Sequence, residues 1–185
     1  TWDPLPAHLP DQDAMVQVKG RVDGTSIATL AEVSFTRTRN LIEDPSFETG
    51  TLAGWTLSDP QKASKVENNA ANARTGAYTF KYWLDKPFQI LLTRTFTGIP
   101  DGTWTFSCTA MGGGGEKAIK VFARDFGGTG EVSVQAVNTG WKKWALYTIP
   151  AIEVTNNQCT IGILIDATAG NWGNFDDFAF HLESP

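Results

Sequence analysis

Carboxylates near the two ends of a long run of strands are the first residues that could do chemistry. Glu48 follows Phe47 in "DPSFETG" at the expected end of a strand, and Asp176 and Asp177 lie in "GNFDDFAF", which is typical of a final buried strand. If the first and last strands pair, these acids meet although they stand far apart in the chain. Inward-leaning carboxylates are costly unless they are neutralised. A calcium ion would neutralise them, because it takes oxygen ligands from carboxylates, carbonyls and water; the alternative is that the acids only cap turns.

Tryptophans form the second set of residues with a chemical use. The chain has seven, and Trp83, Trp141 and Trp172 stand beside polar residues in "FKYWLDK", "NTGWKKW" and "AGNWGN". An exposed indole can stack on the C–H face of a pyranose while polar neighbours bond its hydroxyls. Trp172, inside a Gly/Asn loop, is the strongest of the three candidates, although burial is the alternative for each. Three other tryptophans are expected in the core: Trp55, Trp104 and Trp144.

No motif brings residues together for catalysis. A Ser or Cys nucleophile needs a histidine within hydrogen-bond reach, and the two histidines are His8, near the start, and His181, in the last strand. No G-x-S-x-G elbow is present, and "MGGGGE" lacks the Gly-Lys-Ser/Thr ending of a phosphate loop. Acids are numerous enough for a glycosidase pair, but nothing singles one pair out. We therefore expect no catalytic residues, with a catalytic sandwich, a lyase or hydrolase, as the alternative.

Charge and composition limit the partners. The net charge is −5 and there is no basic block, so nucleic acid and anionic membrane are poor partners and a neutral ligand fits better. No apolar run approaches the roughly 18 residues of a membrane span. Cys108 and Cys159 fall on the apolar side of alternating stretches, which favours buried free thiols, with a disulfide between neighbouring strands as the alternative. A start at Thr1 without a leader leads us to expect a processed or excised fragment.

Short strands must position these residues. From Asn40 onward, alternating stretches such as "GTWTFSCTAM" and "CTIGILIDA" are separated by Gly, Asn, Asp and Pro clusters, and none carries a helical moment. Strands at this spacing predict an all-β fold, an antiparallel β-sandwich or a barrel; the resemblance described next implies the β-sandwich of the jelly-roll kind. Residues 1–39 differ, because two alternating stretches flank "DGTS" in a hairpin-like pattern that is too short for a domain.

The unit 40–185 resembles the jelly-roll carbohydrate-binding modules. Its start, "NLIEDPSFETGTLAGW", is similar to their opening N-L-x-x-N-P-x-F-E-x-G-x-x-x-x-W, with Asp44 in place of the usual Asn. The closing "NWGNFDDFAFHL" is similar to their G-x-x-x-x-D-D-V-x-L, and "GIPDGTWTFSCTAMGGGG" and "GWKKW" resemble family 61 most. Residues 1–39 resemble the C-terminal strands of a bacterial Ig-like module, with a docked hairpin or linker as the alternative.

This resemblance implies a non-catalytic module that binds β-1,4-galactan or galacto-oligosaccharides. It also implies a structural calcium ion held by Glu48 and Asp176, or by Asp177 if the register slips by one, with backbone carbonyls near Ser46 and Arg74. The module is expected to be a secreted monomer that targets a glycoside hydrolase, an endo-galactanase in the same polypeptide, to plant cell-wall polysaccharide. The same fold binding xylan or β-glucan is the runner-up, and an adhesion module that recognises protein is a further alternative.

Galactan has a shape that such a site must match. Its axial O4 coils the chain, so a pocket or short cleft with one or two stacking indoles suits it better than a flat aromatic strip. Arg124 and Asp125 end a strand beside "FGGTG", and Asn171 flanks Trp172. We expect these three to bond sugar hydroxyls; the alternative for each is a solvated polar residue in a loop.

Overall fold

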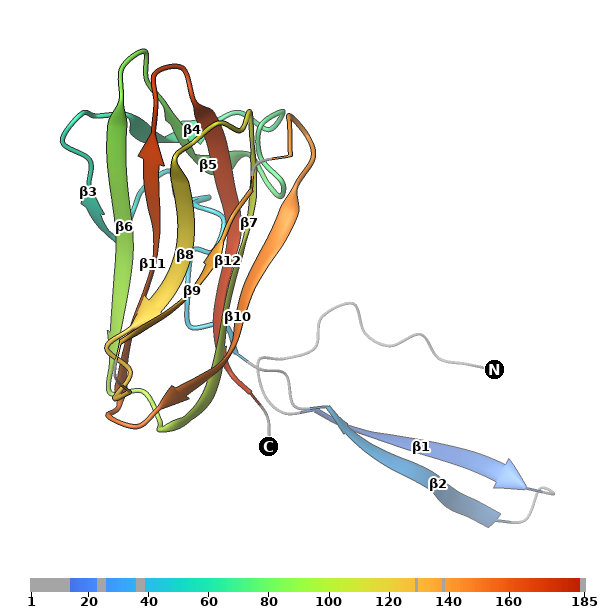
Figure 1. Cartoon of the computed structure of the whole chain (residues 1–185). Helices are drawn as coiled ribbons and strands as arrows, with labels where there is room; N and C mark the ends of the chain where they lie inside the picture. The colour runs from blue at the N-terminus through green and yellow to red at the C-terminus, as the bar shows by residue number, and fades with distance from the viewer. Residues whose placement is uncertain (1–13, 23–25, 36–38, 129, 138, 184–185) are drawn as a thin grey trace. The chain divides into compact units, whose positions relative to one another are not determined.

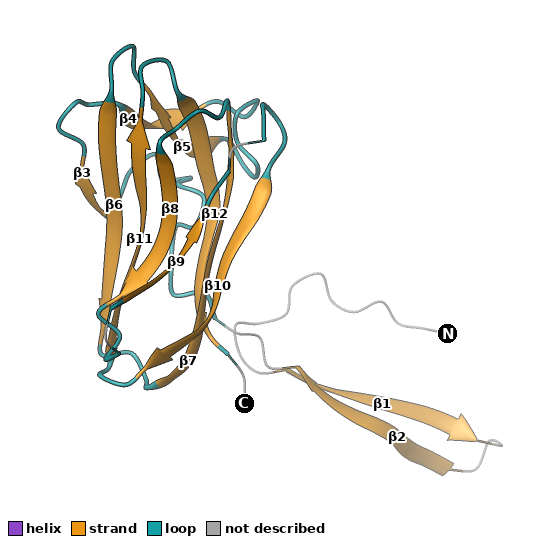
Figure 2. Ribbon diagram, viewed as in Figure 1, coloured by secondary structure: helices purple, strands orange, loops and turns teal. Residues whose placement is uncertain are grey.

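The chain divides into two compact units, 1–39 with 184–185, and 40–183. The computed structural model describes five ranges of residues: 14–22, 26–35, 39–128, 130–137 and 139–183. In that part of the chain every regular element is a strand (Figure 2). It contains no helix long and apolar enough to span a membrane.

The first unit contains one described hairpin. Strand β1 (Ala14–Val22) pairs antiparallel with β2 (Ser26–Phe35), with a shift of register after Val18 (Figure 1). His8 lies outside the described residues. The likeness of this unit to an Ig-like module stays a prediction.

The second unit is a sandwich of two antiparallel five-stranded sheets (Figures 1 and 2). One sheet has the order β10-β7-β12-β5-β4 and the other β3-β6-β11-β8-β9. The predicted antiparallel sandwich is therefore confirmed. The strands are β3 (Thr56–Ser58), β4 (Ser64–Asn68), β5 (Tyr78–Trp83), β6 (Phe88–Thr97), β7 (Gly102–Gly112), β8 (Ala118–Arg124), β9 (Glu131–Gln135), β10 (Ala145–Val154), β11 (Gln158–Ala167) and β12 (Trp172–Leu182).

Alternation along the strands places one apolar face of each sheet against the other. On β7, Trp104, Phe106 and Cys108 are buried, as the sequence predicted. Phe180 of β12 stacks on Trp104, with ring centroids 4.7 Å apart, and on Phe96 of the opposite sheet, at 5.0 Å. Burying one such side chain stabilises the fold by about 1.5–3 kcal/mol. Rings that cross from one sheet to the other therefore hold the two layers together.

The two cysteines are buried and free, as predicted. Cys108 lies on β7 and Cys159 on β11, so they belong to opposite sheets. Burial raises the pKa of the Cys108 thiol. Burial, with a smaller effect of the Asp125 charge, raises the pKa of Cys159 to about 12. Both groups therefore behave as small apolar side chains at neutral pH.

The expected strand end at Phe47 is a turn instead. Phe47 has φ 58°, in the left-handed region, and its ring is buried against Phe178 with centroids 5.5 Å apart. The Asp44 carboxylate accepts hydrogen bonds from the backbone N–H of Glu48, at 2.8 Å, and of Thr49, at 3.2 Å. An acid that binds backbone N–H groups a few residues ahead stabilises a turn rather than a strand.

The tryptophans that were expected in the core differ in depth. Trp104 is fully buried, whereas Trp55 and Trp144 are only half-buried. Trp55 packs edge-on against Phe178, with ring centroids 5.0 Å apart. Trp144 immediately precedes β10, whose next alternate residue, Leu146, is exposed. Trp144 therefore lies at the margin of the core rather than inside it.

Candidate functional site

Two of the candidate indoles stand opposite each other on paired strands. Trp172 of β12 pairs with Trp83 of β5, and Asn174 pairs with Lys81 two residues further along. Because side chains alternate along a strand, these four residues share the face of the sheet that is turned away from the core. Tyr82, between Lys81 and Trp83, points the other way and is fully buried. The register of one strand pair thus builds the centre of the site.

These side chains line a hollow of about 310 Å³. This volume is at the lower end of the range for small-ligand sites. Trp83 is 51% exposed, so much of its indole is free to contact a ligand. We call this space the indole hollow; its lining residues are Asn72, Lys81, Trp83, Trp172 and Asn174.

Trp172 is held in place by close packing against a glycine. A Cβ atom on Gly113 would lie 2.4 Å from Trp172 Nε1, far inside contact distance. The Gly113 N–H also donates to the Trp172 carbonyl oxygen at 3.0 Å. The absence of a side chain at Gly113 therefore lets the half-buried indole lie flat against the backbone of the neighbouring loop.

The third candidate indole does not line the hollow but bonds to a residue that does. Trp141 is 56% exposed, and its Nε1–H donates to Asn72 Oδ1 at 3.2 Å. The Lys142 ammonium lies over the Trp141 ring, 4.7 Å from its centroid. Of the three indoles chosen on sequence alone, Trp83 and Trp172 line the indole hollow, and Trp141 is bonded to Asn72, one of its lining residues.

Glu67 is the residue that the sequence analysis missed. Its carboxylate accepts from Lys81 Nζ at 2.7 Å and from Asn72 Nδ2 at 2.9 Å, and it pairs with Lys65 Nζ at 3.3 Å. Burial alone would raise the pKa of Glu67, but the hydrogen bonds from Lys81, Asn72 and Lys65 lower it. One ionised carboxylate therefore orients two residues that line the indole hollow.

Asn174 supplies an amide without a partner. The residue is 1% exposed, and its Nδ2 has no hydrogen-bond partner in the described part of the chain. A buried donor left unpaired costs about 1–3 kcal/mol. Asn174 lines the indole hollow, but its Nδ2 is buried, so the side chain must shift slightly before a ligand oxygen can accept this hydrogen bond. Binding sites often carry such groups, since the ligand completes them.

Asn171, predicted to bond a sugar, is committed to the protein itself. Its Oδ1 accepts from the N–H and the hydroxyl of Thr168 at 2.8 and 2.9 Å, and its Nδ2 donates to the Gly114 carbonyl at 3.0 Å. The side chain is buried and does not line the indole hollow. Asn171 shapes the turn that leads into Trp172.

The structure does not bring Arg124 and Asp125 to the indole hollow. Arg124 ends β8 and pairs with Thr160 near the start of β11, whereas the loop before Trp172 follows the far end of β11. The Arg124 guanidinium lies over the Phe122 ring, 5.3 Å from its centroid, and its Nε is 3.6 Å from the Asp125 carboxylate. The structure thus does not bring these two residues to the indoles, and their bonding of sugar hydroxyls stays a prediction from the sequence.

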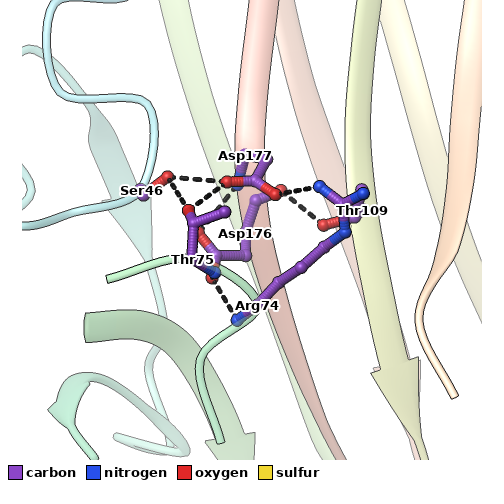
Figure 3. Close-up of polar contacts among 6 residues, drawn as sticks. All are labelled: Ser46, Arg74, Thr75, Thr109, Asp176 and Asp177. Carbon is purple, nitrogen blue, oxygen red and sulfur yellow. Dashed lines mark hydrogen bonds and ion pairs between the residues drawn. The ribbon is translucent and has the colours of Figure 1, made fainter. Parts of the chain in front are cut away.

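Glu48, Asp176 and Asp177 all bond to one loop, 74–78, and Figure 3 shows the part of this arrangement made by the two aspartates. Glu48 accepts from the Ala77 and Tyr78 N–H groups at 3.0 and 2.9 Å. Asp176 Oδ2 accepts from the N–H groups of Arg74, at 2.7 Å, and Thr75, at 3.3 Å. We call the three acids Glu48, Asp176 and Asp177, together with the loop 74–78 to which they bond, the acid clasp. It joins the segment before β3 to β12 through one loop.

Asp177 belongs to the acid clasp as well. Its carboxylate accepts from the Ser46 hydroxyl at 2.8 Å, from the Thr75 hydroxyl and from the Arg74 guanidinium (Figure 3). Neighbours on a regular strand would face opposite sides, but the register shifts between Asp176 and Ala179 and Asp177 has φ 50°. This bulge turns both aspartates toward the same loop.

The residues of the acid clasp, as they lie, do not fit a calcium ion. Calcium needs about six to eight oxygen ligands that converge on one point. Here the oxygens of Glu48, Asp176 and Asp177 face N–H and O–H donors, and the Arg74 guanidinium already supplies positive charge. Within the described ranges, no three acid, histidine or cysteine side chains are grouped closely enough to hold a metal. Calcium therefore stays a prediction from the sequence.

The pKa values within the acid clasp move in opposite directions. Burial raises the pKa of Asp176, although backbone hydrogen bonds from Arg74 and Asp177 act against it. For Asp177 burial acts in the same sense, but hydrogen bonds from Thr75, Arg74 and Ser46 outweigh it and lower the pKa. Asp177 is therefore the better-neutralised carboxylate of the pair.

Known structures decide the family. A structure of TmCBM61 in complex with β-1,4-galactotriose is 33% identical to this chain, covers 78% of it and 99% of the other chain, and has a TM-score of 0.73. The chain belongs to carbohydrate-binding module family 61. No protein-family model matches the sequence of this family 61 module, and no curated protein matches it either.

Two other structures share the fold of the family 61 module at low identity. The Family 16 Carbohydrate Binding Module-2 is 16% identical over 76% of this chain and 99% of its own, with a TM-score of 0.56. The enzymatically active domain of bacteriophage CBA120 tailspike protein 4 is 12% identical over 78% of this chain and 21% of its own, with a TM-score of 0.62. These two likenesses show the fold alone, and it is the likeness to TmCBM61 that confirms the predicted carbohydrate-binding module.

Proposed function

We propose that this family 61 module binds β-1,4-galactan and its oligosaccharides, without cleaving them, in the indole hollow. The observation that carries the proposal is the pairing of Trp83 and Trp172 across β5 and β12, beside the unpaired amide of Asn174. TmCBM61, which is similar to this chain, was crystallised with β-1,4-galactotriose. The likeness to TmCBM61 supports the ligand class, and the geometry of the indole hollow supports the choice of residues.

The lining of the indole hollow suits a neutral sugar. The flat faces of Trp83 and Trp172 can stack on the C–H face of a galactosyl ring. Asn174 Nδ2 and the Lys81 ammonium are donors for hydroxyl oxygens, and Lys81 has donors left after it pairs with Glu67. An apolar surface with a few oriented polar groups is the usual form of a sugar or small-ligand site.

Binding without hydrolysis is supported by the charges at the hollow. Glycoside hydrolysis needs two carboxyl groups on either side of the scissile bond. None of the residues that line the indole hollow carries a carboxyl group. Glu67 lies behind Lys81 and Asn72, to which it is already bonded.

Titration with β-1,4-galactotriose tests the proposal, with Trp172→Ala as the informative variant. Loss of one stacking indole should weaken binding by about 1–3 kcal/mol, which is about fivefold to 150-fold. Isothermal titration calorimetry measures the affinity, and circular dichroism checks the fold. Leu146→Ala, which removes an exposed apolar side chain on β10, is the control.

Three outcomes of that titration would contradict the proposal. If the wild-type protein bound xylo- or gluco-oligosaccharides but not galactotriose, its ligand would be xylan or β-glucan rather than galactan. Release of reducing ends from galactan would show catalysis. Equal affinity of Trp172→Ala and the wild type would place the site elsewhere on the molecule.

The setting of the module is a second part of the proposal. We infer that it is a secreted monomer that directs an attached endo-galactanase to plant cell-wall polysaccharide. The Ig-like pattern of residues 1–39 supports this setting, because such modules are expected in secreted polysaccharide-degrading enzymes. Sedimentation equilibrium with and without ligand measures the mass of the protein in solution, and the mass of a dimer in either state would contradict the proposed monomer.

A further inference from the structure

A second hollow lies against the same indole, on the side of β4. Its volume is about 300 Å³, and it shares Lys81 and Trp83 with the indole hollow. β5 pairs with β12 on one side and with β4 on the other, so the two hollows lie on either side of β5. We call the second space the β4 hollow; its lining residues are Lys62, Ala63, Ser64, Lys65, Lys81, Trp83 and Leu84.

The wall of the β4 hollow is fixed before any ligand binds. The Asp59 carboxylate accepts from the N–H of Ala63 at 2.9 Å, from the N–H of Ser64 at 2.7 Å and from the Ser64 hydroxyl at 2.7 Å. The Trp83 N–H donates to the Ala63 carbonyl oxygen at 2.8 Å, which ties the wall to β5. A site that is already ordered loses little conformational entropy on binding.

The groups in the β4 hollow repeat the chemistry of the indole hollow. Trp83 and Leu84 provide apolar surface, and the ammonium groups of Lys62 and Lys65 provide donors. Lys65 and Lys81 already pair with Glu67, at 3.3 and 2.7 Å, which offsets much of their positive charge. Asp59 adds a further negative charge at the wall. Three lysine ammonium groups lie near two carboxylates, Glu67 and Asp59, so a small positive charge remains, and the ammonium groups can donate to the hydroxyl oxygens of a sugar.

We propose that the β4 hollow is a second galactosyl subsite, so that one galactan chain crosses Trp83 and occupies both hollows. This inference rests on the proposed function of the indole hollow. The half-exposed indole of Trp83 would then contact sugar units on both sides. Short oligosaccharides fill the indole hollow alone, whereas longer ones gain the contacts of the β4 hollow.

A length series separates the two subsites. The affinities of β-1,4-linked galactobiose, galactotriose, galactotetraose and galactohexaose are measured by calorimetry on the whole chain. For the wild type, affinity should rise by about tenfold from the shortest ligand that binds to the hexasaccharide, as expected for one or two added hydrogen bonds. Lys62→Ala with Lys65→Ala should remove most of this rise and leave the affinity for the shortest ligand within about twofold.

A matched control and a stability measurement complete the experiment. Lys117→Ala removes an exposed lysine that is 3.5 Å from Asp166 in the other sheet, and it should keep the wild-type rise with length. Thermal unfolding shows whether the double variant is folded. If it is not, Lys62→Gln with Lys65→Gln, which keeps the length of the stems, replaces it.

The outcomes distinguish the two proposals. An equal affinity of the wild type for all lengths, or an unchanged rise in the double variant, overturns the second subsite and leaves the indole hollow standing. No binding of any length by the wild type overturns the proposed function instead.

Discussion

Glu67 links the side chains of the binding surface at the residue scale. It lies on β4, yet it bonds Lys81 on the next strand and Asn72 in the following loop, and Asn72 in turn accepts from Trp141. The Glu67 carboxylate thus helps to position Trp141 through two hydrogen bonds, one from Asn72 to Glu67 and one from Trp141 to Asn72. Glu67 itself does not line the indole hollow, so it acts as a positioning residue.

Glu67→Gln tests this positioning role. The amide keeps the shape but loses the charge that holds Lys81, so affinity for galactotriose should fall about fivefold, the equivalent of roughly 1 kcal/mol. Calorimetry measures the affinity. Glu131→Gln, which removes the corresponding charge beside Lys120 (2.6 Å) in the other sheet, should leave affinity unchanged.

The pH dependence of binding gives an independent readout for Glu67. The pKa of this group is lowered from its ordinary value of 4.5, so its pairing is fully present above about pH 4.5 and is lost as pH falls through the lowered value. Wild-type affinity should therefore be constant from pH 7 to about pH 5 and decline only in stronger acid. A decline that is identical in Glu67→Gln would show that another group is responsible.

We predict that Asn174 contributes to the affinity for the ligand but not to the stability of the fold. Its Nδ2 has no partner in the described structure, so Asn174→Ala removes an unpaired buried donor. Affinity for galactotriose should fall by about 1–2 kcal/mol while the melting temperature changes by no more than about 2 °C. Differential scanning calorimetry and titration measure the two effects. A large loss of stability with unchanged affinity would make Asn174 a structural residue.

At the scale of elements, the acid clasp links the turn that contains Glu48 and the bulge in β12 to the same loop, 74–78. Asp176 is fully buried and accepts two backbone N–H bonds from Arg74 and Thr75, whereas Asp177 is partly exposed. Asp176→Ala would leave those N–H groups unpaired, so the free energy of unfolding should fall by about 2–3 kcal/mol. Urea unfolding measures it.

Arg74→Met is the companion variant for the acid clasp. Its side chain is 46% exposed, and exposed ion pairs contribute little, so the loss should stay below about 1 kcal/mol. An equal loss in Arg74→Met and Asp176→Ala would mean that charge, rather than backbone hydrogen bonding, holds the clasp.

The elements also show what the sequence could and could not predict. Alternation in "GTWTFSCTAM" predicts both β7 and its buried face, because the pattern is local. The bulge at Asp177 is not local: it exists because the loop 74–78 offers donors to both aspartates. For that reason sequence reasoning had to choose between Asp176 and Asp177, and the structure uses both.

The pairing of strands decides which of the candidate site residues lie together. Trp83 and Trp172 were chosen for their polar neighbours, but only the β5–β12 register shows that they are partners. Arg124 was chosen by the same reasoning and lies at the wrong end of β8, because the direction of that strand depends on its pairing with β11. Glu67 was missed because its partners are brought to it by the β4–β5 register.

At the scale of the whole molecule, the effect of calcium on the melting temperature tests whether the module binds the ion. Because the acid clasp as it lies does not fit the ion, the melting temperature should be equal in EDTA and in excess calcium. If calcium does bind, a free calcium concentration of about 100 times the dissociation constant would instead add about 2.7 kcal/mol to the free energy of unfolding. That would raise the melting temperature by about 5–10 °C. A rise of this size would establish calcium and require the clasp oxygens to rearrange.

Asn40, the first residue of the second unit, is bonded to β12 near the end of that strand. The Asn40 side chain donates to the Phe178 carbonyl at 3.0 Å and accepts from the Phe180 N–H at 2.9 Å, and Glu183 follows the last residue of the same strand. Trp172 begins that strand, at its opposite end. The indole hollow therefore lies at one end of β12, and Asn40 and Glu183 lie at the other end of the same strand.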